Sequence, residues 1–191
     1  MDTTFFDLLG GPKTTWHFQT FDDKKEDTDK TGAFSGSYTE VVHDQLCVAN
    51  KHGAGIFVAV NEHKPKKPRT KVNTIRIRAL FLDFDNLTTA KESLKKVCSV
   101  LAPTMIVESS PGKYHVYYVL HRQDDILVSE FATWQAYLAR EFGSDPKIKD
   151  PSRVMRVPGF KHNKGDPFET VIVECSKIKY GLDDLVGAFY G

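Results

Sequence analysis

The segment 75–85 constrains the fold of this chain more than any other stretch. It reads IRIRALFLDFD, an apolar run that ends in two aspartates two residues apart. Side chains alternate between the two faces of a strand, so Asp83 and Asp85 share one face, with backbones about 7 Å apart. Such a pair is also typical of a turn or of a cap for the next helix. Here the pair lies against apolar sequence, where unpaired carboxylates are costly. Carboxylate oxygens are ligands that Mg²⁺ and Mn²⁺ prefer, so the pair also indicates a metal site.

The order of the elements expected after this strand indicates the fold class. Apolar spacing predicts helices over about 90–101 and 124–142, and apolar runs predict strands over 104–108, 114–120 and 169–175. The order strand, helix, strand, strand, helix, strand is that of an RRM-like antiparallel sheet backed by helices, which is an α+β fold. Strands over 16–21 and 55–60 and a helix within 38–50 predict a small N-terminal αβ lobe.

Length and composition limit the class of protein. A chain of 191 residues predicts a single domain, with an N-terminal lobe over about 1–74 and the RRM-like lobe over about 75–191. No run of 18 apolar residues is present, so no membrane span is expected. Cys47, Cys98 and Cys175 have spacings that fit neither a disulfide framework nor a CxxC zinc site. These features predict a reducing compartment, the cytoplasm.

Positive charge is concentrated in two segments although the net charge is only +1. Residues 61–79 carry seven Lys or Arg and one Glu, and residues 147–164 carry six Lys or Arg and one Asp. Both could be solvated loops, but they also predict a local anion-binding surface. In the first segment Lys66, Lys67 and Arg69 are candidates for holding nucleic-acid phosphates. His17, Tyr117 and Phe160 are aromatic candidates for base stacking.

A set of anion donors surrounds the predicted hairpin turn at 109–113. The sequence SSPGKYH combines serine hydroxyls, turn amides, Lys113 and His115, which together suit a triphosphate. A lone strand histidine is more often structural, so the signal lies in the combination. Further along, Asp150 is the single acid of the second basic segment, and it could either pair with Arg153 or serve as a third metal carboxylate.

Five motifs in this order resemble the archaeo-eukaryotic primase superfamily, and in detail the RepB-like primase or primase–polymerase domains of plasmids and phages. The segments that carry the resemblance are FQTFDD (18–23), ANKHGAGIFVAVNE (49–62), RALFLDFD (78–85), SSPGKYHVYY (109–118) and DPSRVMRVPGFKHNK (150–164). The spacings agree as well, with 30 residues from Asp85 to His115 and 35 from His115 to Asp150.

The resemblance implies specific roles. Asp83, Asp85 and Asp150 would hold two Mg²⁺ or Mn²⁺ ions. Ser110 (or the neighbouring Ser109), Lys113 and His115 would bind the triphosphate, with Arg156 and Lys164 as further contacts. Independently of the resemblance, the charge of the second basic segment makes Lys161 and His162 candidates for nucleic-acid contacts. The implied function is a primase or DNA polymerase that adds nucleotides from nucleoside triphosphates on single-stranded DNA in plasmid or phage replication. A helicase or accessory domain after Gly191 would belong to a longer parent protein.

Two other functions fit parts of the sequence. A non-catalytic RRM-like module would bind single-stranded nucleic acid, but RRM stacking motifs are not recognisable and three acids would weaken phosphate binding. A nicking replication initiator would carry a His-hydrophobic-His motif, and this chain contains no H-x-H.

Overall fold

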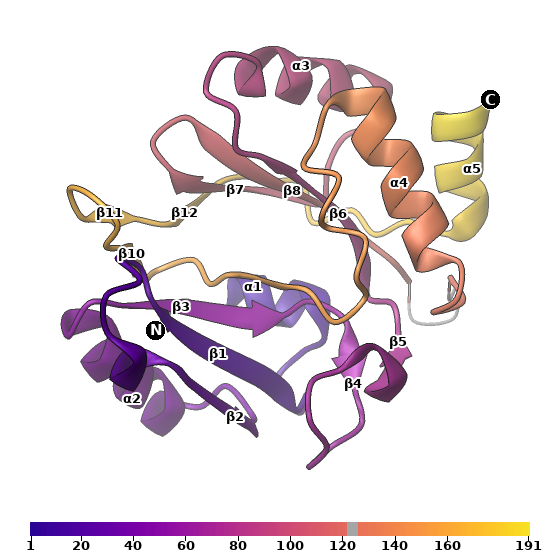
Figure 1. Cartoon of the computed structure of the whole chain (residues 1–191). Coiled ribbons are helices and arrows are strands. Elements are labelled where there is room, and N and C mark those ends of the chain that lie inside the picture. The colour runs from indigo at the N-terminus through magenta and orange to yellow at the C-terminus, as the bar shows by residue number, and fades with distance from the viewer. Residues whose placement is uncertain (122–125) are drawn as a thin grey trace.

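The computed structural model describes residues 1–121 and 126–191. Two four-stranded antiparallel sheets lie one above the other (Figure 1). The first sheet has the order β2 (Gly32–Gly36), β1 (Trp16–Asp22), β3 (Ala54–Ala59) and β9 (Val154–Arg156). The second has the order β12 (Val171–Cys175), β7 (Met105–Ser110), β8 (Lys113–Val119) and β6 (Ala79–Phe84). Two short strand pairs complete the described structure, β4 (Glu62–His63) with β5 (Thr74–Arg76) and β10 (Lys161–His162) with β11 (Phe168–Glu169).

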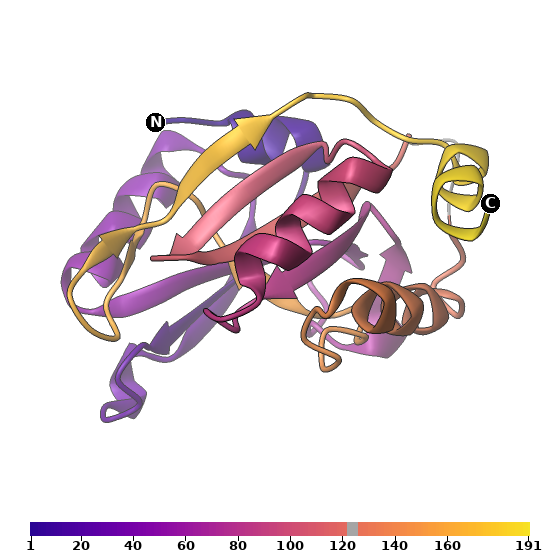
Figure 2. The same ribbon diagram turned by 90° about the horizontal axis from the view of Figure 1, so that it is seen from above.

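Helices cover the second sheet and join the two sheets. The helices are α1 (Thr4–Leu9), α2 (Glu40–Lys51), α3 (Ala90–Val100), α4 (Phe131–Phe142) and α5 (Leu182–Tyr190). Figure 2 shows α3 lying across the second sheet, with α4 toward the side opposite β12. In α1, Phe5 packs edge-on against Tyr117 of β8 and Phe6 packs against Trp16 of β1, so this short helix links the two sheets through the aromatic core. Within the described residues, no helix is long and apolar enough to cross a membrane.

The predicted antiparallel sheet backed by helices is confirmed. Its last strand, β12, has a different neighbour from the one expected in the split βαβ arrangement. In the split βαβ arrangement the last strand lies beside the first, whereas here β12 pairs with β7 and leaves the outer edge of β6 without a neighbouring strand. The side chain of Gln135 covers this edge, because it accepts a hydrogen bond from the Phe81 amide (3.2 Å) and donates one to the Phe81 carbonyl (2.6 Å). This satisfies backbone groups that a strand would otherwise pair.

The first sheet also takes a strand from beyond residue 75, since β9 pairs with β3 in the register Phe57–Arg156. The N-terminal strands and the second basic segment therefore form one sheet. This pairing brings residues from the two predicted lobes together at the same sheet surface.

Two predicted elements differ from the structure. The segment 75–85 forms two strands, because the chain breaks at Ile77 and Arg78, where the buried Arg78 guanidinium lies 4.5 Å from the Trp16 ring centre. The helix expected over 124–142 begins at Phe131; residues 126–130 are not helical, and residues 124 and 125 lie outside the described part. Leu127 lies four residues before Phe131, a spacing that predicts the apolar face of the expected helix, but it is 61% exposed.

Candidate active site

A cleft of about 350 Å³ opens between the two sheets. It brings together eight of the predicted site residues, which are Asp83, Asp85, Ser110, Lys113, His115, Arg156, His162 and Lys164. Ser109, the neighbouring option, lines it too, together with Arg153. The residues lie in β6, β7, β8, β9 and β10 or within two residues of these strands, so the cleft exists only when both sheets are assembled.

Asp83 is fixed through its backbone at the open edge of β6. Its amide donates to the Ser144 hydroxyl at 3.0 Å, and its carbonyl accepts from the Asp145 amide at 2.9 Å. Burial, followed by the charges of Asp85 and Asp145, raises the pKa of the Asp83 carboxyl to about 7. The charges of Arg153 and Lys113 oppose this shift only in part, so the buried Asp83 carboxyl and its acidic neighbours form a setting that a cation would stabilise.

His115 lies directly opposite Asp83 on β8, and its Nε2 is 3.7 Å from the Asp83 Oδ1. Burial and the charges of Arg156 and Arg153 lower the pKa of His115 to about 3, so the imidazole is neutral at pH 7. Within the described residues its Nδ1 is buried without a hydrogen-bond partner. Buried polar atoms in folded proteins almost always have a partner, so this nitrogen points to a water or ligand as its partner.

The hairpin turn between β7 and β8 is built by Gly112. Its φ of +73° is a left-handed conformation that side-chain-bearing residues rarely adopt, and its amide donates to the Glu108 carboxylate at 2.8 Å. The turn sets Lys113 opposite Ser110 across the hairpin. Both side chains consequently line the same wall of the cleft as His115.

Arg156 forms the facing wall and is held from several sides. Its guanidinium contacts both oxygens of Asp23, at 2.6 and 3.3 Å, and lies 4.6 Å from the centre of the Phe57 ring. Asp23 also accepts the Asn163 amide at 2.8 Å. Asp23 and Phe57, with Phe21 beside them, line the cleft and were not predicted, since only the pairing of β9 with β3 brings Arg156 to them.

Asp150 is not among the residues that line the cleft. Its Oδ1 accepts from the Ser152 amide and hydroxyl, both at 2.9 Å, and its carbonyl accepts from the Arg153 amide at 3.0 Å. Asp150 thus starts the turn whose next residues reach the cleft. Asp145, which no sequence signal indicated, is the acid of this segment whose charge acts on Asp83, and it pairs with Arg153 at 3.9 Å.

The other predicted nucleic-acid contacts are divided between two places. His162 lines the cleft, while Lys161 is exposed outside it. Lys66, Lys67 and Arg69 line a separate groove beside the first sheet. The prediction that three aromatic residues are exposed for base stacking is wrong, because His17, Tyr117 and Phe160 are only 7%, 0% and 3% exposed. Their rings pack in the interior.

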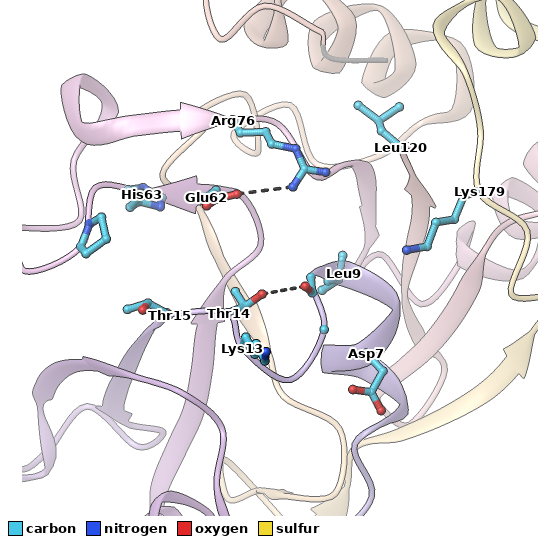
Figure 3. A pocket seen from close by; sticks show the side chains of 13 residues that line it. Asp7, Leu9, Lys13, Thr14, Thr15, Glu62, His63, Arg76, Leu120 and Lys179 are labelled. Atoms are coloured by element: carbon cyan, nitrogen blue, oxygen red, sulfur yellow. Dashed lines mark hydrogen bonds and ion pairs between the residues drawn. The ribbon is translucent and has the colours of Figure 1, made fainter. Parts of the chain in front are cut away.

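A second hollow, of about 380 Å³, lies beside β4 and β5 (Figure 3). Figure 3 shows Glu62 paired with Arg76, and their closest atoms are 3.4 Å apart. Thr14 closes the loop after α1 by donating its hydroxyl to the Gly10 carbonyl at 2.7 Å. These contacts explain the local structure, and this hollow shares no lining residue with the cleft.

Comparisons with solved structures show the same fold in replication proteins. The primase–polymerase (PrimPol) AEP domain of cyanophage S-2L superposes with a TM-score of 0.77 at 20% identity, over 96% of this chain and 94% of that one. The catalytic domain of primase RepB' in complex with initiator DNA gives 0.64 at 18% identity, over 98% and 94%. Primase RepB' gives 0.67 at 17% identity, over 96% of this chain and 59% of that one.

A search of curated proteins gives no match. The family described as the RepB DNA-primase N-terminal domain matches residues 34–179. That span contains β6, the 109–113 turn and the segment 150–164, which supply most of the residues that line the cleft; Phe21 and Asp23 lie before it. The chain therefore belongs to the RepB DNA-primase N-terminal domain family.

Proposed function

We propose that this domain is a template-dependent nucleotidyltransferase, a primase or DNA polymerase that joins nucleotides from triphosphates on single-stranded DNA. Membership in a DNA-primase domain family supports a primase-like role in replication. The observation that carries the finer proposal is the composition of the cleft, in which the paired carboxylates at the end of β6 lie beside Ser110, Lys113 and His115 of the neighbouring hairpin, while Arg156 comes from the other sheet. Acids for metals and donors for a triphosphate are the two parts that phosphoryl transfer requires.

The residues of the cleft fit a divalent cation. In residues 1–121 and 126–191, no three His, Cys, Asp or Glu side chains gather closely enough to hold a metal by themselves. Mg²⁺, however, is commonly held by one or two carboxylates together with substrate phosphates and water. Asp83 and Asp85 supply such a pair, and burial together with the charges of Asp85 and Asp145 raises the pKa of Asp83, an effect that a bound cation would oppose. When bound, Mg²⁺ or Mn²⁺ would lower the pKa of the attacking 3′-hydroxyl and stabilise the pyrophosphate leaving group.

The protein's own groups would position the triphosphate. Lys113, Arg153 and Arg156 bring positive charge to the cleft, and the neutral His115 presents a ring nitrogen without a protein partner. Because Arg156 is already fixed by Asp23 and Phe57, it would contact a phosphate without losing much side-chain freedom. Catalysis by this set is positioning and charge neutralisation rather than proton transfer.

The third carboxylate comes from the segment 145–150 in this proposal. We retain Asp150 as the proposed metal ligand because the resemblance to RepB-like primase domains implies this role, and its exposed carboxylate lies in the turn whose next residues reach the cleft. Asp145 is given a different role, because its amide and charge act on Asp83. Asp150→Ala is therefore expected to abolish incorporation, whereas Asp145→Asn keeps the backbone amide and lowers the rate less.

The central test is single-nucleotide extension of a primed DNA template with Mn²⁺. Asp83→Ala is expected to lower the rate by at least about 100-fold, because it removes stabilisation made only in the transition state. Asp44→Ala, which changes an exposed aspartate on α2, is the matched control and should extend at the wild-type rate. Circular dichroism verifies that both variants are folded.

Equal rates in wild type and Asp83→Ala would contradict the proposal. A chelator separates it from the non-catalytic binding module. The proposed enzyme loses turnover in EDTA while the free domain still binds DNA, whereas a binding module shows no turnover with or without metal.

A further inference from the structure

A groove of about 310 Å³ lies beside the first sheet, away from the acidic end of β6. It is formed by residues 17–18, 33–35 and 66–69, and we call it the basic groove. Its lining includes Lys66, Lys67 and Arg69 and no acid, whereas the active-site cleft includes four aspartates. The basic groove is therefore suited to an anion that needs no metal.

The loop that carries these lysines is held in a defined shape. The Lys64 amide donates to the Asn73 carbonyl at 2.8 Å, and the Asn73 side chain donates to the Pro68 carbonyl at 2.9 Å. Lys66 adopts a left-handed φ of +58° at the tip. Hydrogen bonds hold the backbone at both ends of the loop, so the exposed Lys66 and Lys67 side chains extend from an ordered segment. Less conformational entropy is then lost when they bind a ligand.

An aromatic surface lies in the same groove. Phe34, on the edge strand β2, is 39% exposed and stacks on Phe18 with ring centres 5.1 Å apart. Phe18 is the register partner of Phe34 on β1, so both rings lie on the face of the sheet opposite His17 and Gln19, and Phe34 reaches the groove from the edge strand. Cations beside an exposed aromatic ring are the combination that binds single-stranded nucleic acid, through phosphates and stacked bases.

The basic groove is connected to the active-site cleft along one face of β1. His17, Gln19 and Phe21 alternate along this strand and so point to the same side; His17 lines the groove and Phe21 lines the cleft. Four residues of strand span about 13 Å. Between the two ends, Gln19 lies 3.5 Å from the Arg69 guanidinium, which also donates to the Ser152 carbonyl.

We propose that the basic groove binds single-stranded DNA and holds the template strand as it passes from the cleft along β1. Lys66 and Lys67 contact successive phosphates, and a base stacks on Phe34. Arg69 connects the groove to the Asp150–Ser152 turn through its hydrogen bonds and is not a main DNA contact. The identity of this strand as the template rests on the proposed function, but binding in the groove does not.

Fluorescence anisotropy with labelled oligothymidylate tests the groove directly. An oligomer of about 20 nucleotides exceeds the usual site sizes of about 4–16. Titrations in EDTA, repeated over a range of salt, remove catalysis from the measurement. Lys66→Ala/Lys67→Ala is expected to weaken binding about tenfold at low salt and to reduce the salt slope by about 1.4, which corresponds to two phosphate contacts. Phe34→Ala is expected to weaken binding at least about fivefold with the slope unchanged.

The matched control is Lys91→Ala/Lys95→Ala, which removes two exposed lysines from α3 and should bind like wild type. If the double variant at Lys66 and Lys67 has the wild-type affinity and slope, or if the α3 control weakens binding equally, the groove assignment is overturned. Weakened binding only in the groove variants, in a protein without nucleotide incorporation, would support the groove while refuting the proposed enzyme.

Discussion

At the scale of the residue, Gly55 determines whether Arg156 can reach its place in the cleft. A Cβ at position 55 would lie 2.5 Å from the Asp23 Oδ1 and 2.8 Å from the Arg156 Nη1. The ion pair between Asp23 and Arg156 thus packs directly on the bare backbone of β3. Glycine is needed here for close approach.

Gly55→Ala is expected to destabilise the protein by about 1–3 kcal/mol, since the added methyl forces apart a well-packed contact. Urea denaturation measures this change. The same variant should raise the KM for nucleotide, because Arg156 loses its fixed position. Gly36→Ala is the control on the same sheet, where an added Cβ meets nothing within 4 Å. If the two variants unfold at the same urea concentration, the packing argument for Gly55 is wrong.

The residues that could be predicted are those whose signal is local in sequence. Asp83 follows from strand alternation, and Lys113 and His115 follow from a turn that gathers polar groups. Asp23 and Asp145 could not be found in this way, because their partners lie 133 and 62 residues away in the chain. Nothing in the sequence near either aspartate indicates which strand edge it will meet.

At the scale of the element, Gln135 takes the place of a missing strand at the outer edge of β6. The side chain is 1% exposed and also donates to the Ile148 carbonyl at 3.1 Å. It therefore connects α4, the segment before Asp150 and the strand that ends at the paired aspartates. An apolar run such as 79–84 predicts a buried strand, but it carries no information on what covers the strand's edge.

Gln135→Met keeps the approximate volume and removes the polar groups, so the Phe81 amide and two carbonyls lose their partner. We expect a loss of at least about 3 kcal/mol in the free energy of unfolding, because three backbone groups lose their partner and each buried unpaired group costs about 1–3 kcal/mol. Hydrogen exchange gives the local readout, in which the Phe81 amide should exchange faster than its neighbours in β6. Unchanged protection of that amide would show that another group covers the edge.

At the scale of the whole molecule, buried histidines make stability depend on pH. Burial lowers the pKa of His63 to about 4, whereas in an unfolded chain it is about 6.5. Between these values the unfolded chain binds more protons, so the free energy of unfolding falls as the pH drops from about 6.5 to about 4. Asp83 acts in the opposite sense, because its raised pKa favours the folded state at low pH and this contribution is lost as the pH rises through about 7.

His63→Asn isolates the histidine contribution. Between pH 7 and pH 4, the wild type is expected to lose about 2 kcal/mol more stability than the variant. Urea titrations at several pH values measure the difference between the two slopes. Parallel slopes would mean that His63 does not remain neutral in the folded protein.

The pairing of β9 with β3 also has a consequence for biosynthesis. Val154–Arg156 contribute the second wall of the cleft. They are synthesised after β1, β3 and the strand that bears Asp83. A nascent chain halted before this point holds the acidic pair but not the arginine that faces it. Under the proposed function, such a truncated product lacks Arg156 and should bind nucleoside triphosphates less well than the finished protein.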